Sequence, residues 1–562
     1  MSPDAVQPPP TLGNQYETDR GLQSLLRRLL PEAVHAAVEP ELRAMGERAG
    51  GALYALQQAD LEAEPTLTRW GPWGDRVDRI EPTRVWTRAA KIAAREGVVA
   101  TAYEQTHGRY SRLHQMALAY LFIPSTDMYG CPLAMTDGAA RTLLDNGRAS
   151  VAEAAVPHLT ARDPDAFWTS GQWMTEIAGG SDVSNTRTTA RRDDEGTWRL
   201  YGRKWFTSAI TANMALALAR PADTPEDRAE DSAGLALFYV PVHRHGTLAE
   251  GLYVHRLKDK LGTRKLPTAE LQLDGVAARP VTDELRHGTR HIAPMLTVTR
   301  LWNAVTAAAY LRRGLALARD YARKRTAFGR RILDHPLHRD TLATLEAQLE
   351  GMMHLSFRVA ALLGRRETDA STPSHRRLLR LLTPIAKLTT AKQAVAGTSE
   401  VLEAFGGAGY VEDTGLPPLH RDAQVLPIWE GTTNVLALDL VRGLQAENGL
   451  DLIGGDIEQC RSAVHDAQLR AAVQTAHDAF AHAAAWFRSA QSDGRDALQA
   501  GARRFALTLG HALELAYTAR HAQWALRAEQ DERPKAAAER LAASPIDRIS
   551  EHSATGADAL VQ

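Results

Sequence analysis

The sequence has few of the residues that build disulfide frameworks, metal clusters or membrane spans. Its 562 residues include only two cysteines, Cys131 and Cys460, too few for a disulfide framework or a cysteine metal cluster. No apolar run approaches the roughly 18 consecutive residues of a membrane helix. The 66 basic and 67 acidic side chains give a net charge of −1, so no overall positive field attracts nucleic acid or anionic lipid. We therefore expect a cytoplasmic protein without membrane attachment.

Several common active-site signatures are also missing. The sequence has no phosphate-binding P-loop and no Gly-x-Ser-x-Gly elbow. The run Gly407-Ala408-Gly409 lacks the third glycine of a dinucleotide-binding turn and does not follow a strand. His335 and His338 are three residues apart, but no carboxylate or further histidine completes a metal site. We predict no metal centre.

Length and hydrophobic periodicity divide the chain into several parts. A chain of 562 residues exceeds what one core usually holds. Helical spacing of apolar residues dominates except in the middle, where short apolar runs alternate with turn residues. We predict an α+β fold, mostly α, with a disordered leader at 1–15, an N-terminal helical domain at 16–165, a central β domain at 166–285, a C-terminal four-helix bundle at 286–445, and a helical extension with a loose tail at 446–562.

The stretch 421–434 carries the strongest chemical signal. Glu430 stands between an apolar run that ends at Trp429 and a polar run that begins at Gly431. Such a carboxylate can reach into an apolar cavity, and burial there would raise its pKa toward the range of a general base. The alternative is structural: Glu430 would face the dipole of a helix N-terminus, with Thr432 or Thr433 as the cap.

Two segments of the β domain suggest contacts with a flat or phosphorylated ligand. Residues 174–182 combine hydroxyl groups, two glycines and a Ser-Asp pair, which would present backbone N–H and hydroxyl donors to a phosphate or a flavin edge. In the run 204–208, adjacent Trp205 and Phe206 could wall a heterocycle while Thr207 bonds its edge. The alternatives are an ordinary turn and strand-end core packing.

Arg325 and Phe328 follow the first long helix of the bundle. They are three residues apart and share a helical face if the helix continues. The pair would then offer a guanidinium for a phosphate beside an aromatic ring for a purine. The alternative is a solvated basic helix end that interacts with the helix dipole.

In order and spacing, these segments resemble the acyl-CoA dehydrogenase family over roughly residues 175–434. Residues 175–182 resemble its first signature, 205–208 its flavin-edge strand, 325–329 its arginine–phenylalanine motif, and 403–409 with 421–434 its second signature. Within the family the chain is most similar to the AidB branch, flavoproteins of the adaptive response to DNA alkylation. That similarity rests on 256–264, Cys131-Pro132, Trp429 and the C-terminal extension.

The resemblance implies FAD bound between the β domain and the bundle. It also implies a homotetramer, in which part of each site reaches the cofactor of a neighbouring subunit. The residues implied to contact FAD are Met174, Thr175, Gly180, Ser181, Trp205 and Thr207 from one subunit, Arg325, Phe328, Glu403 and Gly407 from a neighbour, and Thr432 and Asn434 beside the base Glu430.

The reaction implied by the resemblance is dehydrogenation of an acyl thioester. Glu430 would remove the α-proton while the β-hydride passes to flavin N5, and an electron-transfer flavoprotein or oxygen would accept the electrons. One alternative is oxidation of an unusual non-CoA substrate.

A second alternative is an AidB-like flavoprotein that associates with DNA, which requires a basic patch. Residues 446–562 hold 12 basic and 16 acidic side chains, a net charge of −4. That balance argues against DNA binding by the extension as a whole. A folded cluster would need Arg503, Arg504, Arg520 and Arg527 to come together.

Overall fold

The computed structural model describes residues 7–222, 232–244, 246–446, 448–550 and 559–561, and its chain forms two compact units. One unit comprises Met1–Gly51, Gln105–Pro124 and Asn303–Gln562; the other comprises Ala52–Glu104 and Ser125–Trp302. We call them the helical unit and the β unit. The α+β, mostly α fold expected from the sequence is confirmed. Most of the predicted loose tail lies outside the described residues.

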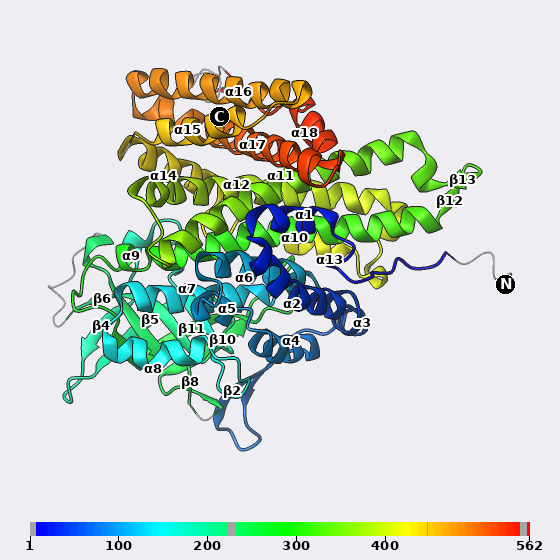
Figure 1. Cartoon of the computed structure of the whole chain (residues 1–562). Helices are drawn as coiled ribbons and strands as arrows, with labels where there is room; N and C mark the ends of the chain where they lie inside the picture. The colour runs from blue at the N-terminus through cyan, green and yellow to red at the C-terminus, as the bar shows by residue number, and fades with distance from the viewer. Residues whose placement is uncertain (1–6, 223–231, 245, 447, 551–558, 562) are drawn as a thin grey trace. The chain divides into compact units, whose positions relative to one another are not determined.

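The β unit is built around one seven-stranded sheet (Figure 1). Strand β7 pairs with both β6 and β11, so β11, β5, β4, β6 and β7 close into a ring. The strands are β3 (Ser170–Trp173), β4 (Thr189–Arg192), β5 (Trp198–Ser208), β6 (Met214–Pro221), β7 (Ala236–Pro241), β10 (Leu252–Leu257) and β11 (Thr268–Pro280).

Alternation along these strands sends apolar side chains into a single core. Trp173, Leu200 and Phe238 are buried there, and the ring of Phe238 meets that of Trp198 edge-on at 5.7 Å between centroids. The helices of the β unit are α3 (Ala52–Ala59), α4 (Arg84–Arg95), α5 (Ala100–Glu104), α7 (Gly130–Asn146), α8 (Ala149–Leu159) and α9 (Gly288–His291).

An antiparallel hairpin interrupts the N-terminal region that the sequence presented as helical. Strands β1 (Thr66–Trp70) and β2 (Arg76–Glu81) pair from Thr66↔Glu81 to Trp70↔Arg76. The turn between them contains glycines at 71 and 74, and Gly74 has φ +90°. Glycine-rich turn residues between two alternating runs are a hairpin signal, which the prevailing helical pattern obscured.

The helical unit contains the four long helices expected of the bundle, α10, α11, α12 and α14. The extension packs on them through α17, which contacts α11, α12 and α14 as well as α15, α16 and α18 (Figure 1). The helices of this unit are α1 (Arg20–Leu29), α2 (Glu32–Gly50), α6 (Ser111–Phe122), α10 (Ala293–Lys324, whose first turns belong to the β unit), α11 (Pro336–Glu367), α12 (Pro373–Ala404), α13 (Pro417–Ala423), α14 (Thr433–Ala446), α15 (Gly449–Ser462), α16 (Ala467–Asp493), α17 (Arg495–Ala528) and α18 (Arg533–Ala543).

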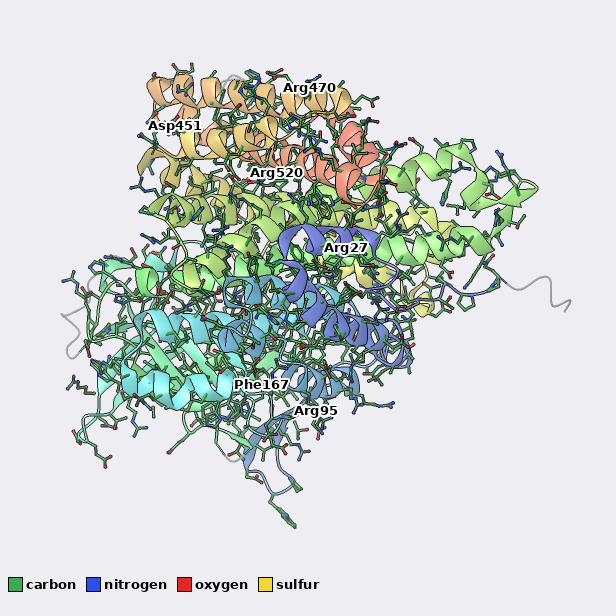
Figure 2. All side chains as sticks on the ribbon, viewed as in Figure 1. Arg27, Arg95, Phe167, Asp451, Arg470 and Arg520 are labelled. Atoms are coloured by element: carbon green, nitrogen blue, oxygen red, sulfur yellow. The ribbon has the colours of Figure 1, made fainter. Side chains whose placement is uncertain are left out.

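Helix α17 is the centre of the extension because α15, α16 and α18 contact it as well as the bundle helices. Every residue from Ala512 to Ala519 is buried, so two full turns of the helix have no exposed face, as expected of a helix in a core. Its basic residues lie near its ends; Figure 2 shows Arg520 on this helix and Arg470 on α16. None of the described helices combines the length and the apolarity needed to cross a bilayer.

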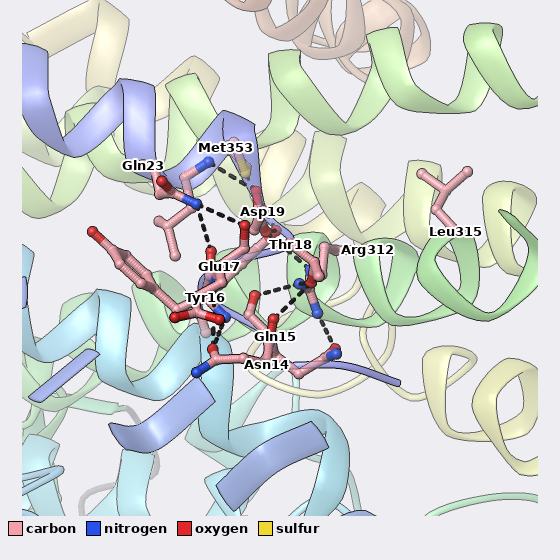
Figure 3. A network of polar contacts seen from close by, with 12 residues as sticks. Asn14, Gln15, Tyr16, Glu17, Thr18, Asp19, Gln23, Arg312, Leu315 and Met353 are labelled. Atoms are coloured by element: carbon pink, nitrogen blue, oxygen red, sulfur yellow. Dashed lines mark hydrogen bonds and ion pairs between the residues drawn. The ribbon is translucent and has the colours of Figure 1, made fainter. Parts of the chain in front are cut away.

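The described part of the predicted disordered leader is held in place, which corrects that expectation for residues 11–15. Arg312 of α10 donates from Nη1 to Oε1 of Gln15 and from Nη2 to the Gln15 carbonyl (Figure 3). Its Nε donates to Oδ2 of Asp19 at 2.9 Å. The backbone N–H of Thr11 donates to Asp320 at 2.7 Å. The proline-rich composition of the leader did not indicate that it would bond to α10.

Candidate active site

Glu430 lies on a sharp turn between α13 and α14 in the helical unit. Its φ is +56°, and that of the following Gly431 is +100°. A left-handed conformation costs a non-glycine residue roughly 1–3 kcal/mol and persists only when the surroundings fix it. The Glu430 side chain is partly exposed. The surrounding structure therefore stabilises a strained backbone at Glu430, and this fixes the direction of its carboxylate.

Two buried side chains fix this turn from neighbouring helices. Lys387 of α12, fully buried, donates from Nζ to the carbonyl of Gly431 at 2.7 Å. Trp429 donates from its indole N–H to Oδ1 of Asn303, a buried residue of α10. These bonds hold Trp429 and Gly431, the residues before and after Glu430. The backbone of Glu430 therefore cannot relax without breaking them.

The same turn also starts α14, as the structural alternative expected. The hydroxyl of Thr432 accepts from the N–H of Val435 at 3.4 Å, and its carbonyl accepts from the N–H of Leu436 at 2.9 Å. Thr432 is thus a helix cap, and Asn434 in the first turn is exposed. Oδ1 of Asn434 accepts from Nη1 of Arg503 in the extension at 3.3 Å.

The end of α12 presents the other predicted residues of this signature. Glu403 and Gly407 are both exposed, and a Cβ at Gly407 would meet no atom within 4 Å. By contrast, a Cβ at Gly409 would lie 2.0 Å from the carbonyl oxygen of Leu402. Gly409 is therefore required by packing, whereas Gly407 leaves an open approach to the backbone.

Arg325 and Phe328 do not share a helical face, which corrects the sequence-based expectation. Helix α10 ends at Lys324, and the next residues form a hairpin of β12 (Thr326–Ala327) and β13 (Arg330–Arg331). Phe328 and Gly329 form its turn with φ of +50° and +79°, the backbone typical of a two-residue hairpin loop. Phe328 is 98% exposed. Arg325 is also exposed, so both side chains remain available to a ligand or a second chain.

In the β unit, the loop 174–182 follows β3 and is tied to β5. The carbonyl of Thr175 accepts from the N–H of Trp205 at 3.0 Å. A Cβ at Gly180 would lie 2.7 Å from Oγ1 of Thr175, so a side chain there would displace the threonine. Gly180 and Ser181 are exposed, and within the described residues their backbone N–H groups donate to no protein acceptor.

The remaining predicted residues of this unit differ in how accessible they are. Met174 and Trp205 are partly buried, whereas Thr207 is fully buried. The hydroxyl of Thr207 donates to the Ala269 carbonyl at 2.8 Å, which leaves it only acceptor capacity. Nζ of Lys258 lies 3.7 Å from the ring centroid of Trp205, so one face of the indole is occupied by a cation.

A buried ion pair between Lys204 and Glu176 fixes the loop, and it was not apparent from the sequence. Nζ of Lys204, 0% exposed, donates to Oε1 of Glu176 at 2.8 Å and to the Leu218 carbonyl at 2.9 Å. Glu176 also accepts from the N–H of Arg187 at 2.7 Å and from Thr188. Burial works against ionisation of Glu176, but Lys204 and these donors outweigh it and lower its pKa. The sequence did contain a signal for this ion pair, because Lys204 stands at an inward-facing position of an alternating strand.

Comparison with known proteins shows the same combination of parts. Residues 7–166 match a family model described as adaptive response protein AidB N-terminal domain, residues 171–276 the acyl-CoA dehydrogenase middle domain, and residues 286–445 the acyl-CoA dehydrogenase C-terminal domain. The chain is similar to acyl-CoA dehydrogenase family member 11 of Caenorhabditis elegans, with 46% identity over 457 residues, covering 80% of this chain and 74% of that protein. It is also similar to the putative acyl-CoA dehydrogenase AidB of Escherichia coli, with 32% identity over 394 residues, covering 69% and 70%.

Among solved structures, Caenorhabditis elegans ACDH-11 in complex with C11-CoA superposes with a TM-score of 0.93 at 39% identity, covering 98% of this chain and 94% of that one. A second structure, described as Bd2924 apo-form, gives a TM-score of 0.85 at 41% identity over 92% and 99%. The chain therefore belongs to the acyl-CoA dehydrogenase family of oxidoreductases, which act on CH–CH bonds, and within that family it is AidB-like.

Proposed function

We propose that this protein is an FAD-dependent acyl-CoA dehydrogenase in which Glu430 removes the α-proton of an acyl thioester. The observation that carries the proposal is the turn at Glu430, whose backbone has φ +56° and whose neighbours are bonded to Lys387 and Asn303, so that a partly exposed carboxylate has a fixed position. Strain that the surroundings maintain is concentrated at functional sites. A general base must also point at one atom of its substrate, and this turn supplies a fixed direction.

The residues of the β unit fit an FAD molecule. The N–H groups of Gly180 and Ser181 suit an anionic or carbonyl acceptor, and the closeness of Gly180 to Thr175 explains why a side chain is absent there. Trp205 supplies an aromatic surface. When bound, FAD would accept the hydride from the β-carbon. Met174 and Thr207 would line the same region, Thr207 as an acceptor.

The chain's own work is to bind, orient and deprotonate the substrate. The resemblance assigns polarisation of the thioester carbonyl to the backbone N–H of Glu430, which makes the α-proton more acidic while the side chain removes it. Gly431 and Thr432, immediately after the base, add little bulk. Thr432 and Asn434 would contact FAD from the first turn of α14.

We further propose that a second subunit completes the site and that the assembly is a homotetramer. Arg325, Phe328, Glu403 and Gly407 are all exposed. A phenylalanine that is 98% exposed at the tip of a hairpin is unusual on a free surface and suits contact with another chain. Phe328→Ser is expected to shift the assembly toward smaller species in light scattering and to weaken FAD retention. An unchanged mass and unchanged FAD content would contradict this part of the proposal.

The central experiment replaces Glu430 with glutamine. The FAD-loaded variant should keep its cofactor and fold but reduce acyl-CoA, followed as anaerobic bleaching of the flavin band, about 10²–10⁴-fold more slowly. Because the worm relative was solved with C11-CoA, the thioester panel should include chains of that length. The exposed Glu400 of α12 gives the matched control, and Glu400→Gln should react at the normal rate. Full activity of Glu430→Gln would remove Glu430 from the mechanism.

A DNA-associated role gains no support from the charge distribution of the extension. Arg503 and Arg520 are 17 positions apart on α17, about 25 Å along the helix axis. Arg520 and Arg527 line a cavity, whereas Arg503 contacts Asn434. The four arginines therefore do not form the single patch that duplex binding would require.

A further inference from the structure

A cavity of about 360 Å³ lies within the helical unit, among α1, α11 and α17. Its lining includes four arginines, Arg28, Arg358, Arg520 and Arg527, together with His354 and Trp524. No aspartate or glutamate is among the described lining residues, and none of the residues assigned above to acyl-CoA dehydrogenation lines it. The cavity is thus a second polar centre of the molecule, and it is strongly basic.

One of the four arginines is fully neutralised by the protein. Arg358 donates to Asp456 at 2.6 Å and 3.2 Å, and the hydroxyl of Tyr517 donates to the same carboxylate. Burial works against the charge of Arg358, but Asp456 outweighs it and raises the arginine's pKa. The charge of Arg358 is therefore already compensated within the protein.

The other three arginines have no such partner. Within the described residues, the side chains of Arg28, Arg520 and Arg527 make no hydrogen bond or ion pair, and Nε of Arg28 is shielded from solvent. Burial, followed by the charge of nearby Arg520, lowers the pKa of Arg28 to about 10. Arg520 and Arg527 are exposed and can be hydrated, whereas the shielded Nε of Arg28 is a strong donor without an acceptor in the described chain.

His354 adds an unused polar group at the same place. Its side chain is 0% exposed, and neither ring nitrogen makes a hydrogen bond within the described residues, although Nε2 lies 3.4 Å from Oε2 of Glu350. Burial and the charge of Arg28 hold the pKa of His354 well below the usual range. Buried polar groups are normally hydrogen-bonded, so the ring nitrogens of His354 retain the capacity to bond a ligand in the cavity.

The site is held in shape by contacts at both ends of α1. At the start, Asp19 caps the helix through Leu22 and is bonded by Arg312 (Figure 3). Near the end, Arg27, labelled in Figure 2, donates to Glu529 at 2.6 Å. Arg28 follows Arg27 directly, so the cavity wall that carries it is fixed before any ligand arrives.

We propose that this cavity binds a small phosphorylated molecule of the nucleotide class, with its phosphates on Arg28, Arg520 and Arg527 and its base against Trp524. Guanidinium groups match phosphate oxygens in charge and geometry, and an indole offers a stacking surface for a flat base. The volume is in the range of small-molecule sites.

The test is calorimetric titration of the FAD-saturated, full-length protein with ADP and, separately, with inorganic pyrophosphate. FAD saturation blocks the cofactor site, and the substitutions distinguish the cavity from the CoA site. Arg28→Gln combined with Arg527→Gln should weaken binding of both probes about 10-fold or more. Trp524→Leu should weaken ADP but leave pyrophosphate unchanged. Arg470→Gln, an exposed charge-matched control on α16 (Figure 2), should alter neither.

Several results would overturn the proposal. One is no binding of either probe; another is ADP binding of equal strength in the wild type and the double variant. A third is a mixed-sequence DNA duplex that loses affinity through the same substitutions while ADP binding is unaffected, because this would assign the arginines to DNA. Should the double variant lose FAD or melt early, Arg527→Gln alone decides, since Arg527 is exposed at the end of α17. The inference is independent of the role proposed for Glu430.

Discussion

Two arginines beside α1 have opposite surroundings. Arg312, at the start of the helix, donates to Gln15, Asp19 and Thr18. Arg28, in the last turn, donates to no group of the described chain. Arg312 is therefore part of the framework, whereas Arg28 retains the capacity to bind an anion. The role of a shielded guanidinium depends on which acceptors reach it and not on the residue type.

The two glutamates of the signature segments differ in how far they are buried. Glu176 accepts from Lys204, Arg187 and Thr188 and is buried, so it holds a loop in place. Glu430 is partly exposed on a strained turn that is gripped on either side. A fully bonded carboxylate cannot accept a substrate proton without loss of structure, whereas an accessible one can.

The largest structural effect is expected from Arg312→Met. The substitution leaves the buried carboxylate of Asp19 with only Tyr120 and its own helix as partners, and breaking a buried pair costs about 3–5 kcal/mol. Amide hydrogen exchange should show α1 opening more readily by that free energy. Arg442→Met is the control, because Arg442 is 72% exposed and lies 3.8 Å from Asp439; its α1 should exchange as in the wild type. Equal exchange of α1 in both variants would contradict the framework role of Arg312.

A smaller, pH-dependent effect is expected in the β unit. Because the folded pKa of Glu176 lies below its ordinary value of 4.5, its ion pair contributes stability above that pH and loses it as the pH falls through the lower folded value. Glu176→Gln should lower the free energy of unfolding by about 2 kcal/mol at neutral pH. The stability of this variant should then fall less steeply in acid than that of the wild type. Melting temperatures from pH 7 to pH 3 measure this, with the exposed Glu62→Gln as control. Parallel curves for Glu176→Gln and the wild type would show that the pair is not what titrates.

The sequence predicted the regular elements better than their assembly. Apolar periodicity located α10, α11, α12 and α14, and alternation located the main strands. It did not show that residues 105–124 leave their neighbours to join the helical unit, because that choice depends on long-range packing. The hairpin of β1 and β2 was missed although its glycine turn was visible, since the surrounding helical pattern dominated.

The sequence suggested which residues belong to the candidate site but not how they are arranged in space. The segment around Glu430 stands out locally, yet the groups that fix it, Lys387 and Asn303, are 44 and 126 positions away from the atoms they bind. The prediction that Arg325 and Phe328 share a helical face was wrong because Phe328-Gly329 adopts a hairpin turn. The arginines of the cavity come from α1, α11 and α17, and no local pattern unites them.

The smallest effect, and the one of opposite sign, is expected from Arg28→Met. Replacing an unpaired, shielded cation with an apolar side chain of similar length removes repulsion from Arg520 and unused donors, so the ligand-free protein should gain about 1 kcal/mol. ADP should reduce or reverse this difference in stability, because it stabilises the wild type more than the variant that lacks Arg28. Melting curves with and without ADP measure both differences. If Arg28→Met instead destabilised the protein as Arg312→Met does, Arg28 would have an acceptor within the chain, and the contrast between the two arginines would no longer hold.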